Sequence, residues 1–125
     1  MNDIFMNKAF IFPGQGSQKV GMAKDFHDSF PIAKEVFQSV NDTLNYDLSK
    51  IIFEGSDEEL ALTTNTQPAL MATSIAILKV LQQETGQNIM DLCDIVAGHS
   101  LGEYSALCAA ESISLEDTAK LLKIR

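Results

Sequence analysis

DIVAGHSLGEYSAL, residues 94–107, gives the strongest indication of the fold. Residues 94–97 are predicted to form a buried strand, and residues 101–110 a helix. The pentapeptide between them, Gly98-His99-Ser100-Leu101-Gly102, has the G-x-S-x-G pattern of a nucleophile elbow. Glycines avoid side-chain clashes in so sharp a turn. The pattern predicts a serine hydroxyl at a strand's carboxyl end, beside helix N–H groups that can stabilise an oxyanion. The alternative is a glycine-bracketed turn with an incidental serine.

A second strand and turn lie near the start of the sequence. Residues 9–12 are apolar and end at Pro13-Gly14, which predicts another buried strand. The following turn, FPGQGSQ at residues 12–18, can aim backbone N–H groups at an anion, although a simple turn fits equally well. It is not a phosphate loop, because the lysine of that motif is missing. In a parallel sheet this turn and the GHSLG turn are expected at the same edge.

Helices are predicted between and after these strands. Asp28 or Ser29 is the expected cap of the first one. The helices are expected at residues 31–44, 47–53, from the Ser56 cap onward, 67–83, 101–110, and from the Ser114 cap to Arg125. Strands separated by helices predict an α/β fold with a parallel sheet flanked by helices, in one domain spanning residues 1–125. Residues 67–83 are apolar on nearly every face, and two strands do not make a stable sheet alone. We therefore expect part of a larger fold.

Composition excludes several classes of function. The net charge is −8 and no basic run occurs, so no nucleic-acid partner is expected. Cys93 and Cys108 lack metal or disulfide spacing, which predicts reduced core thiols in a cytoplasmic protein. No apolar stretch approaches the ~18 residues of a membrane span, and residues 1–16 lack the pattern of a secretory signal. The spacing of histidine and cysteine indicates no metal site, and no cofactor is expected.

Three motifs occur together and in order, namely FPGQGSQ at 12–18, TQPAL at 66–70 and GHSLGEYSAL at 98–107. Together they resemble the malonyl-CoA:acyl carrier protein transacylases of fatty acid biosynthesis, and also the acyltransferase domains of polyketide synthases. The resemblance runs over essentially the whole chain. It implies the N-terminal part of an α/β-hydrolase-like acyltransferase subdomain, without the family's smaller ferredoxin-like subdomain. The short lead before the first motif suits the free-standing enzyme better than a synthase module.

The resemblance implies roles for four residues. Ser100 matches the acyl-accepting serine, and the backbone N–H groups of Gln15 and Leu101 match the oxyanion hole. Arg125 matches the arginine that grips the malonyl carboxylate. A guanidinium suits this role because it can hold a carboxylate through two parallel charge-assisted hydrogen bonds. Taken alone, an arginine at a helix end would instead be a solvated charge that suits the helix dipole.

The implied reaction is a ping-pong transfer. Ser100 would take the malonyl group from malonyl-CoA and pass it, through a malonyl-serine ester, to the phosphopantetheine thiol of acyl carrier protein. Two other classes of function remain open. One is a serine hydrolase or esterase, since such enzymes share the elbow. The other is a non-catalytic module that binds acyl carrier protein or coenzyme A.

The sequence departs from the family at the general base. A serine hydroxyl needs one, and the histidines here are His27 and His99. His99 should point away from the neighbouring Ser100 and play a structural role, while His27 matches no motif and is expected at the surface. The family's catalytic histidine lies downstream of the arginine, so the isolated chain is expected to be inactive. Three explanations fit: a partial reading frame, a separate chain that supplies the rest, or a decayed remnant.

Glu111 is a second departure, because the family commonly has glycine there.

Overall fold

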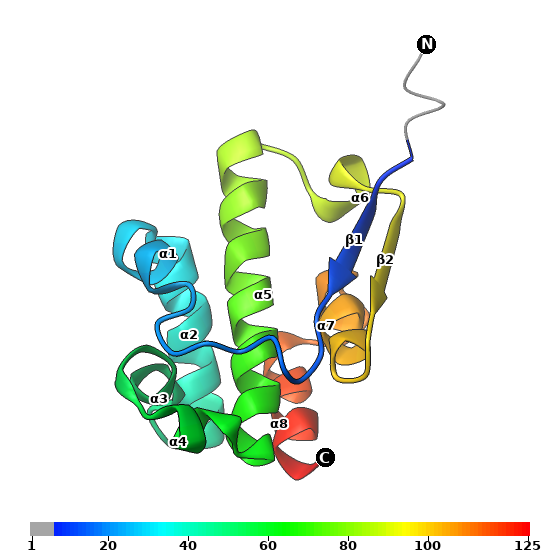
Figure 1. Cartoon of the computed structure of the whole chain (residues 1–125). Coiled ribbons are helices and arrows are strands. Elements are labelled where there is room, and N and C mark those ends of the chain that lie inside the picture. The colour runs from blue at the N-terminus through cyan, green and yellow to red at the C-terminus, as the bar shows by residue number, and fades with distance from the viewer. Residues whose placement is uncertain (1–6) are drawn as a thin grey trace.

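Two short parallel strands and eight helices make up the part of the chain that the computed structural model describes, residues 7–125 (Figure 1). The expectation of no secretory signal partly concerns residues 1–6, which lie outside the described range. The elements are β1 (Ala9–Phe12), α1 (Lys24–Ser29), α2 (Pro31–Leu44), α3 (Leu48–Glu54), α4 (Asp57–Ala61), α5 (Thr63–Thr85), α6 (Ile89–Leu92), β2 (Ile95–Gly98), α7 (Gly102–Ala109) and α8 (Leu115–Ile124).

The two strands pair in parallel, and their carboxyl ends meet at one edge of the sheet. Phe10 lies opposite Val96, and Phe12 lies opposite Gly98. Helix α7 packs against both strands and α5 packs against α7, so the predicted α/β class is confirmed. The strands are less buried than predicted, since Ile11 is 67% and Ile95 61% exposed. Successive side chains of a strand face opposite sides, and Ile11 and Ile95 share the side opposite to Phe12, which is buried.

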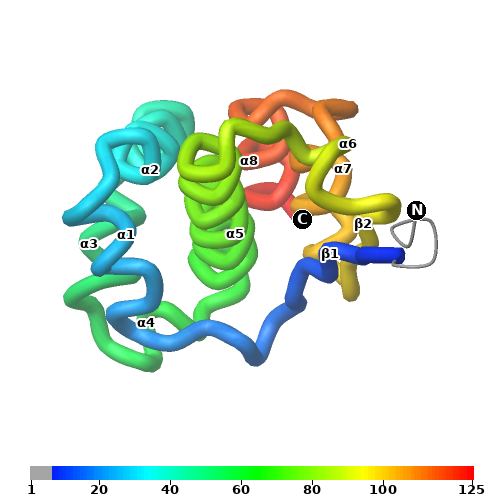
Figure 2. Tube along the Cα trace, turned by 90° about the horizontal axis from the view of Figure 1, so that it is seen from above, coloured from blue at the N-terminus to red at the C-terminus, as the bar shows by residue number. Residues whose placement is uncertain are grey.

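Helix α5 forms the centre of the molecule. It contacts α2, α7 and α8, and Figure 2 shows it between the α1–α4 group and the sheet. Thirteen of its residues are buried, which explains why residues 67–83 are apolar on nearly every face. Ile77 and Leu81 of the same helix remain 38% exposed each, on the side that looks toward β1.

Several boundaries differ from the predictions. Helix α5 begins at Thr63, four residues before the predicted start, and continues through Pro68. The cap of α2 is Phe30, not Asp28 or Ser29, because those two residues belong to α1, a helix that the sequence did not predict. Helix α6 was not predicted either. The predicted cap Ser114 is confirmed, since its hydroxyl accepts a hydrogen bond from the Asp117 N–H at 3.0 Å.

Both cysteines are free thiols, Cys93 buried and Cys108 half-buried, as predicted. No helix within residues 7–125 combines the length and the apolar character that a membrane crossing requires.

Candidate active site

Ser100 occupies a strained turn between β2 and α7. Its φ angle is 57°, in the left-handed region that non-glycine residues seldom adopt. Both flanking glycines are required by close backbone packing. A Cβ at Gly98 would overlap the carbonyl group of Gly102, and a Cβ at Gly102 would overlap the carbonyl of Phe12 in β1. The glycines therefore let the turn close on itself and lie against the neighbouring strand.

The turn after β1 contacts the turn after β2. The His99 N–H donates a hydrogen bond to the Phe12 carbonyl at 3.2 Å. A Cβ at Gly14 would lie only 2.7 Å from the His99 carbonyl oxygen, so Gly14 packs directly on the serine turn. The two motif turns thus meet at one edge of the sheet, as the parallel arrangement predicts.

Gln15 and Leu101 present backbone N–H groups at this meeting point. Leu101 is fully buried and forms the N-cap of α7, while Gln15 lies exposed in the turn after β1. Neither N–H donates a hydrogen bond to another group within residues 7–125. Neither donor is therefore committed to a hydrogen bond in that part of the chain.

Arg125 reaches the serine from the end of α8. Its Nη2 donates a hydrogen bond to Ser100 Oγ at 3.2 Å. Its Nη1 lies 3.5 Å from Gln67 Oε1, and its Cζ lies 5.4 Å from the centre of the Tyr104 ring. The only arginine in the sequence thus stands beside the hydroxyl of the candidate nucleophile.

Gln67 and Tyr104 were not singled out from the sequence. Gln67 is nearly buried in the first turns of α5, and Tyr104 is half-buried in α7. The only available signal was their place inside the TQPAL and GHSLGEYSAL motifs. Their contact with Arg125 depends on how α5, α7 and α8 pack, which no local pattern reveals.

Neither histidine is hydrogen-bonded to Ser100 within residues 7–125. The His99 side chain is exposed, and within the described residues it makes no hydrogen bond with the serine. His27 is less exposed than expected, with 21% of its side chain accessible, because it packs against Phe37 and Phe53. Its Nδ1 lies 3.0 Å from Asp28, and this hydrogen bond, with a second from Lys24, holds the pKa of the Asp28 carboxyl below its usual value.

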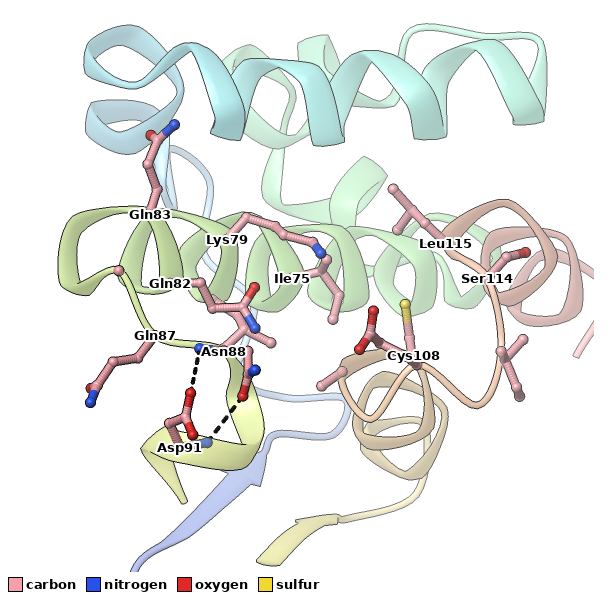
Figure 3. A pocket seen from close by; sticks show the side chains of 15 residues that line it. Ile75, Lys79, Gln82, Gln83, Gln87, Asn88, Asp91, Cys108, Ser114 and Leu115 are labelled. Carbon is pink, nitrogen blue, oxygen red and sulfur yellow. Dashed lines mark hydrogen bonds between the residues drawn. The ribbon is translucent and has the colours of Figure 1, made fainter. Parts of the chain in front are cut away.

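A cavity of about 670 Å³ lies elsewhere, between α5, α6 and the turn after α7 (Figure 3). Ile75, Lys79, Asp91, Cys108 and Leu115 are among the side chains that line it, and none of the four predicted site residues does. Over residues 7–125, no three histidine, cysteine, aspartate or glutamate side chains are grouped so as to hold a metal ion.

Comparison with known proteins yields one consistent family. The model of the acyl transferase domain family matches residues 9–125. The malonyl CoA-acyl carrier protein transacylase of Bacillus subtilis (strain 168) is 50% identical over 117 residues, covering 94% of this chain and 35% of that protein. The chain therefore spans little more than a third of that relative's length.

Solved structures agree. The acyl-carrier-protein-S-malonyltransferase of Bartonella henselae superposes with a TM-score of 0.92 at 55% identity, covering 95% of this chain and 38% of that one. The solved complex of a type II PKS acyl-carrier protein with its malonyl-transacylase contains a chain that superposes with a TM-score of 0.86 at 43% identity. This match covers 94% of the present chain and 37% of the chain in that complex. These similarities confirm the resemblance that the three motifs predicted.

Proposed function

Because the chain belongs to the acyl transferase domain family, we propose that it provides the nucleophile-bearing part of a malonyl transferase. Its substrate would be malonyl-CoA, and the acceptor would be the phosphopantetheine thiol of acyl carrier protein. The proposal requires no cofactor beyond the coenzyme A of the substrate. One observation carries it, namely the hydrogen bond from Arg125 to the Ser100 hydroxyl.

That contact suits a malonyl group better than a neutral acyl group. A malonyl thioester carries its carboxylate two bonds beyond the carbonyl carbon that a nucleophile attacks. A cation beside Ser100 Oγ can therefore hold the carboxylate while the hydroxyl faces the thioester carbonyl. Arg125 can form two parallel charge-assisted hydrogen bonds to it, which acetyl-CoA cannot accept.

The proposed chemistry proceeds through an ester. Ser100 Oγ attacks the thioester carbonyl carbon while a base takes the hydroxyl proton. The oxyanion is stabilised by the N–H groups of Gln15 and Leu101, both of which lack another partner in the described chain. The carbon–sulfur bond then breaks, and coenzyme A leaves as the thiol after taking up a proton. The thiol of the carrier protein attacks the malonyl-serine ester in the same way and regenerates Ser100.

We propose that the base comes from polypeptide equivalent to the remaining two-thirds of the relatives. Such polypeptide would dock at the edge of β1 that faces away from β2, where no strand pairs within residues 7–125. The carbonyls of Lys8 and Phe12 bond toward β2, so in a parallel ladder the backbone groups of Ala9 and Ile11 face the opposite edge. Another parallel strand could pair there and extend the sheet.

A groove beside this edge fits an apolar strand. It has a volume of about 520 Å³ and lies between β1 and α5, lined mostly by apolar residues, including the half-exposed Ile77 and Leu81. Thr73 also lines it, and its buried hydroxyl has no hydrogen-bond partner within residues 7–125. A strand laid in the groove would bury the apolar wall and offer that hydroxyl a backbone partner.

The test uses the chain alone and the chain mixed with the complementary part of the Bacillus subtilis relative. We expect the chain alone to transfer malonyl groups far more slowly than ~1 per second, a typical low enzyme rate. We expect the mixture to form malonyl-carrier protein, and mass spectrometry to find the ester on Ser100. Ser100→Ala should abolish transfer, whereas Ser112→Ala, at an exposed serine, should not. Transfer by the Ser100→Ala mixture would refute the proposal.

Arg125→Ala separates this function from its rivals. A malonyl transferase should lose its preference for malonyl-CoA over acetyl-CoA, whereas an esterase acting through the same elbow should keep its ester hydrolysis. A non-catalytic binding module would never carry an acyl group on Ser100.

A further inference from the structure

Lys123, in the last turn of α8, forms hydrogen bonds with Tyr46 and with the start of α5. Lys123 Nζ donates a hydrogen bond to the Tyr46 hydroxyl at 3.0 Å and lies 4.3 Å from the centre of that ring. The same ammonium group lies 3.5 Å from the Thr64 carbonyl oxygen. That carbonyl lacks its usual helical partner, because the residue four positions later is Pro68, which has no N–H. Lys123 thus supplies a donor that the helix itself cannot.

The chain of hydrogen bonds continues into the core. The Tyr46 hydroxyl donates to Asn65 Oδ1 at 3.0 Å, and Asn65 Nδ2 donates to the Glu59 carbonyl at 2.9 Å. Asn65 is only 7% exposed, so burial and these hydrogen bonds hold its side-chain amide in place. Lys123 is therefore connected through Tyr46 and Asn65 to the buried start of α5.

The position of this bridge matters because Arg125 follows two residues later. In the same way Gln67, which contacts Arg125, follows Asn65 by two residues. Figure 1 shows the C-terminus beside the end of α5 where that helix begins. An arginine side chain has large rotamer entropy, so a contact that fixes this turn of α8 also limits the positions that Arg125 can occupy. Without the bridge, Arg125 would sample many positions besides the one facing Ser100.

We propose that Lys123 is a positioning residue, acting through Tyr46 and Asn65 to hold Arg125 against Ser100. This inference rests on the proposed function, since it gives Arg125 its role as the carboxylate-binding group. Lys123 itself touches neither Ser100 nor the place of the acyl group. Replacing Lys123 should therefore reduce the preference of the chain for malonyl over acetyl thioesters.

The sequence offers a direct probe, because Arg125 is its only arginine. Its side-chain Nε–H group therefore gives a single assignable signal in a nitrogen–proton NMR spectrum of the full chain. In the wild type we expect this signal to lie away from the position of a solvated arginine and to move when malonyl-CoA is added. Acetyl-CoA should move it much less.

Lys123→Met should shift the signal toward that of a solvated arginine and weaken malonyl-CoA binding by roughly tenfold, since a displacement of about 1 Å costs a positioned group much of its effect. Acetyl-CoA affinity should not change. Lys123→Arg should restore both properties, because a guanidinium can also donate to Tyr46. The matched control is Lys120→Met, at an exposed lysine of the same helix, which should behave as the wild type.

The outcomes distinguish the positioning role of Lys123 from the proposed function of the chain. If Lys123→Met matches Lys120→Met in both measurements, the positioning role is overturned. If Arg125→Ala leaves the preference for malonyl-CoA intact, the proposed function fails, whatever Lys123 does. Should Lys123→Met prevent folding, Tyr46→Phe decides, because it removes the hydroxyl but keeps the packed ring. An unchanged Arg125 signal in Tyr46→Phe would then refute the inference.

Discussion

The two ends of α7 carry the same unusual backbone conformation in different settings. Ser100 precedes the helix with a φ of 57°, and Glu111 follows it with a φ of 65°. At the Ser100 end, backbone packing on β1 surrounds the turn, and Arg125 holds the side chain. At the Glu111 end, the exposed side chain has no hydrogen-bond partner within residues 7–125.

The Glu111 end is an ordinary helix termination with an unusual residue. The Ser112 N–H donates to the Leu107 carbonyl at 2.9 Å, and the Glu111 N–H donates to the Cys108 carbonyl at 3.0 Å. These are the two bonds of a Schellman motif, whose left-handed position is usually glycine. This explains why glycine is expected here from the family resemblance. The strain at Ser100 aims a hydroxyl, whereas the strain at Glu111 has no such use in the structure.

Gly102→Ala gives the largest expected effect in this comparison. The new methyl group would overlap the Phe12 carbonyl, so β1 and the serine turn must separate, at a cost of about 3 kcal/mol in the free energy of unfolding. Urea denaturation measures it. Gly86→Ala is the control, because Gly86 has a φ of 70° and open space around it, and its cost should be about 1 kcal/mol. Equal losses in the two variants would show that backbone overlap is not what maintains the serine turn.

Glu111→Gly should stabilise the chain by about 0.5–1 kcal/mol, because relief of left-handed strain exceeds the added entropy of the unfolded glycine. The same denaturation experiment detects this gain. Glu111→Ala removes the charge but keeps the Cβ, so it should bring little change. If alanine stabilises as much as glycine, charge rather than backbone strain is the cause. Malonyl-CoA binding should be unaffected by either substitution, since Glu111 lies at the far end of α7.

The smallest expected effect concerns the alkylation rate of Cys108, which lies near Glu111 at the end of α7. Burial raises the pKa of its thiol, an effect partly opposed by a hydrogen bond with Thr118. A raised pKa means less reactive thiolate at a given pH, and burial also restricts access to the sulfur. Alkylation at pH 8 should therefore be slower in the folded chain than in urea. Because folding favours the neutral thiol, this contribution to stability is lost as the pH rises through the folded-state pKa. Equal alkylation rates at Cys108 in both states, by peptide mass spectrometry, would contradict the burial.

Sequence patterns located most elements but not their environment. The bounds of β1 and the cap of α8 agree with prediction because strand formers, breakers and a capping serine act locally. Helices α1 and α6 were missed because both are short and have no apolar stripe long enough to recognise. The early start of α5 was missed because residues 63–66 are polar and extend no apolar pattern, whereas tertiary contacts sustain the helix there and through Pro68.

The serine turn could be recognised from the sequence, because its glycines, the preceding strand and the following helix are consecutive and Gly98 packs on Gly102 within the turn. Its packing on Phe12 of β1 and the groups that face the serine depend on the tertiary structure. Arg125 lies 25 residues after Ser100 and 58 after Gln67, and these three side chains meet because α5, α7 and α8 pack at particular angles. That packing depends on burial of whole helix faces, which a short motif cannot specify.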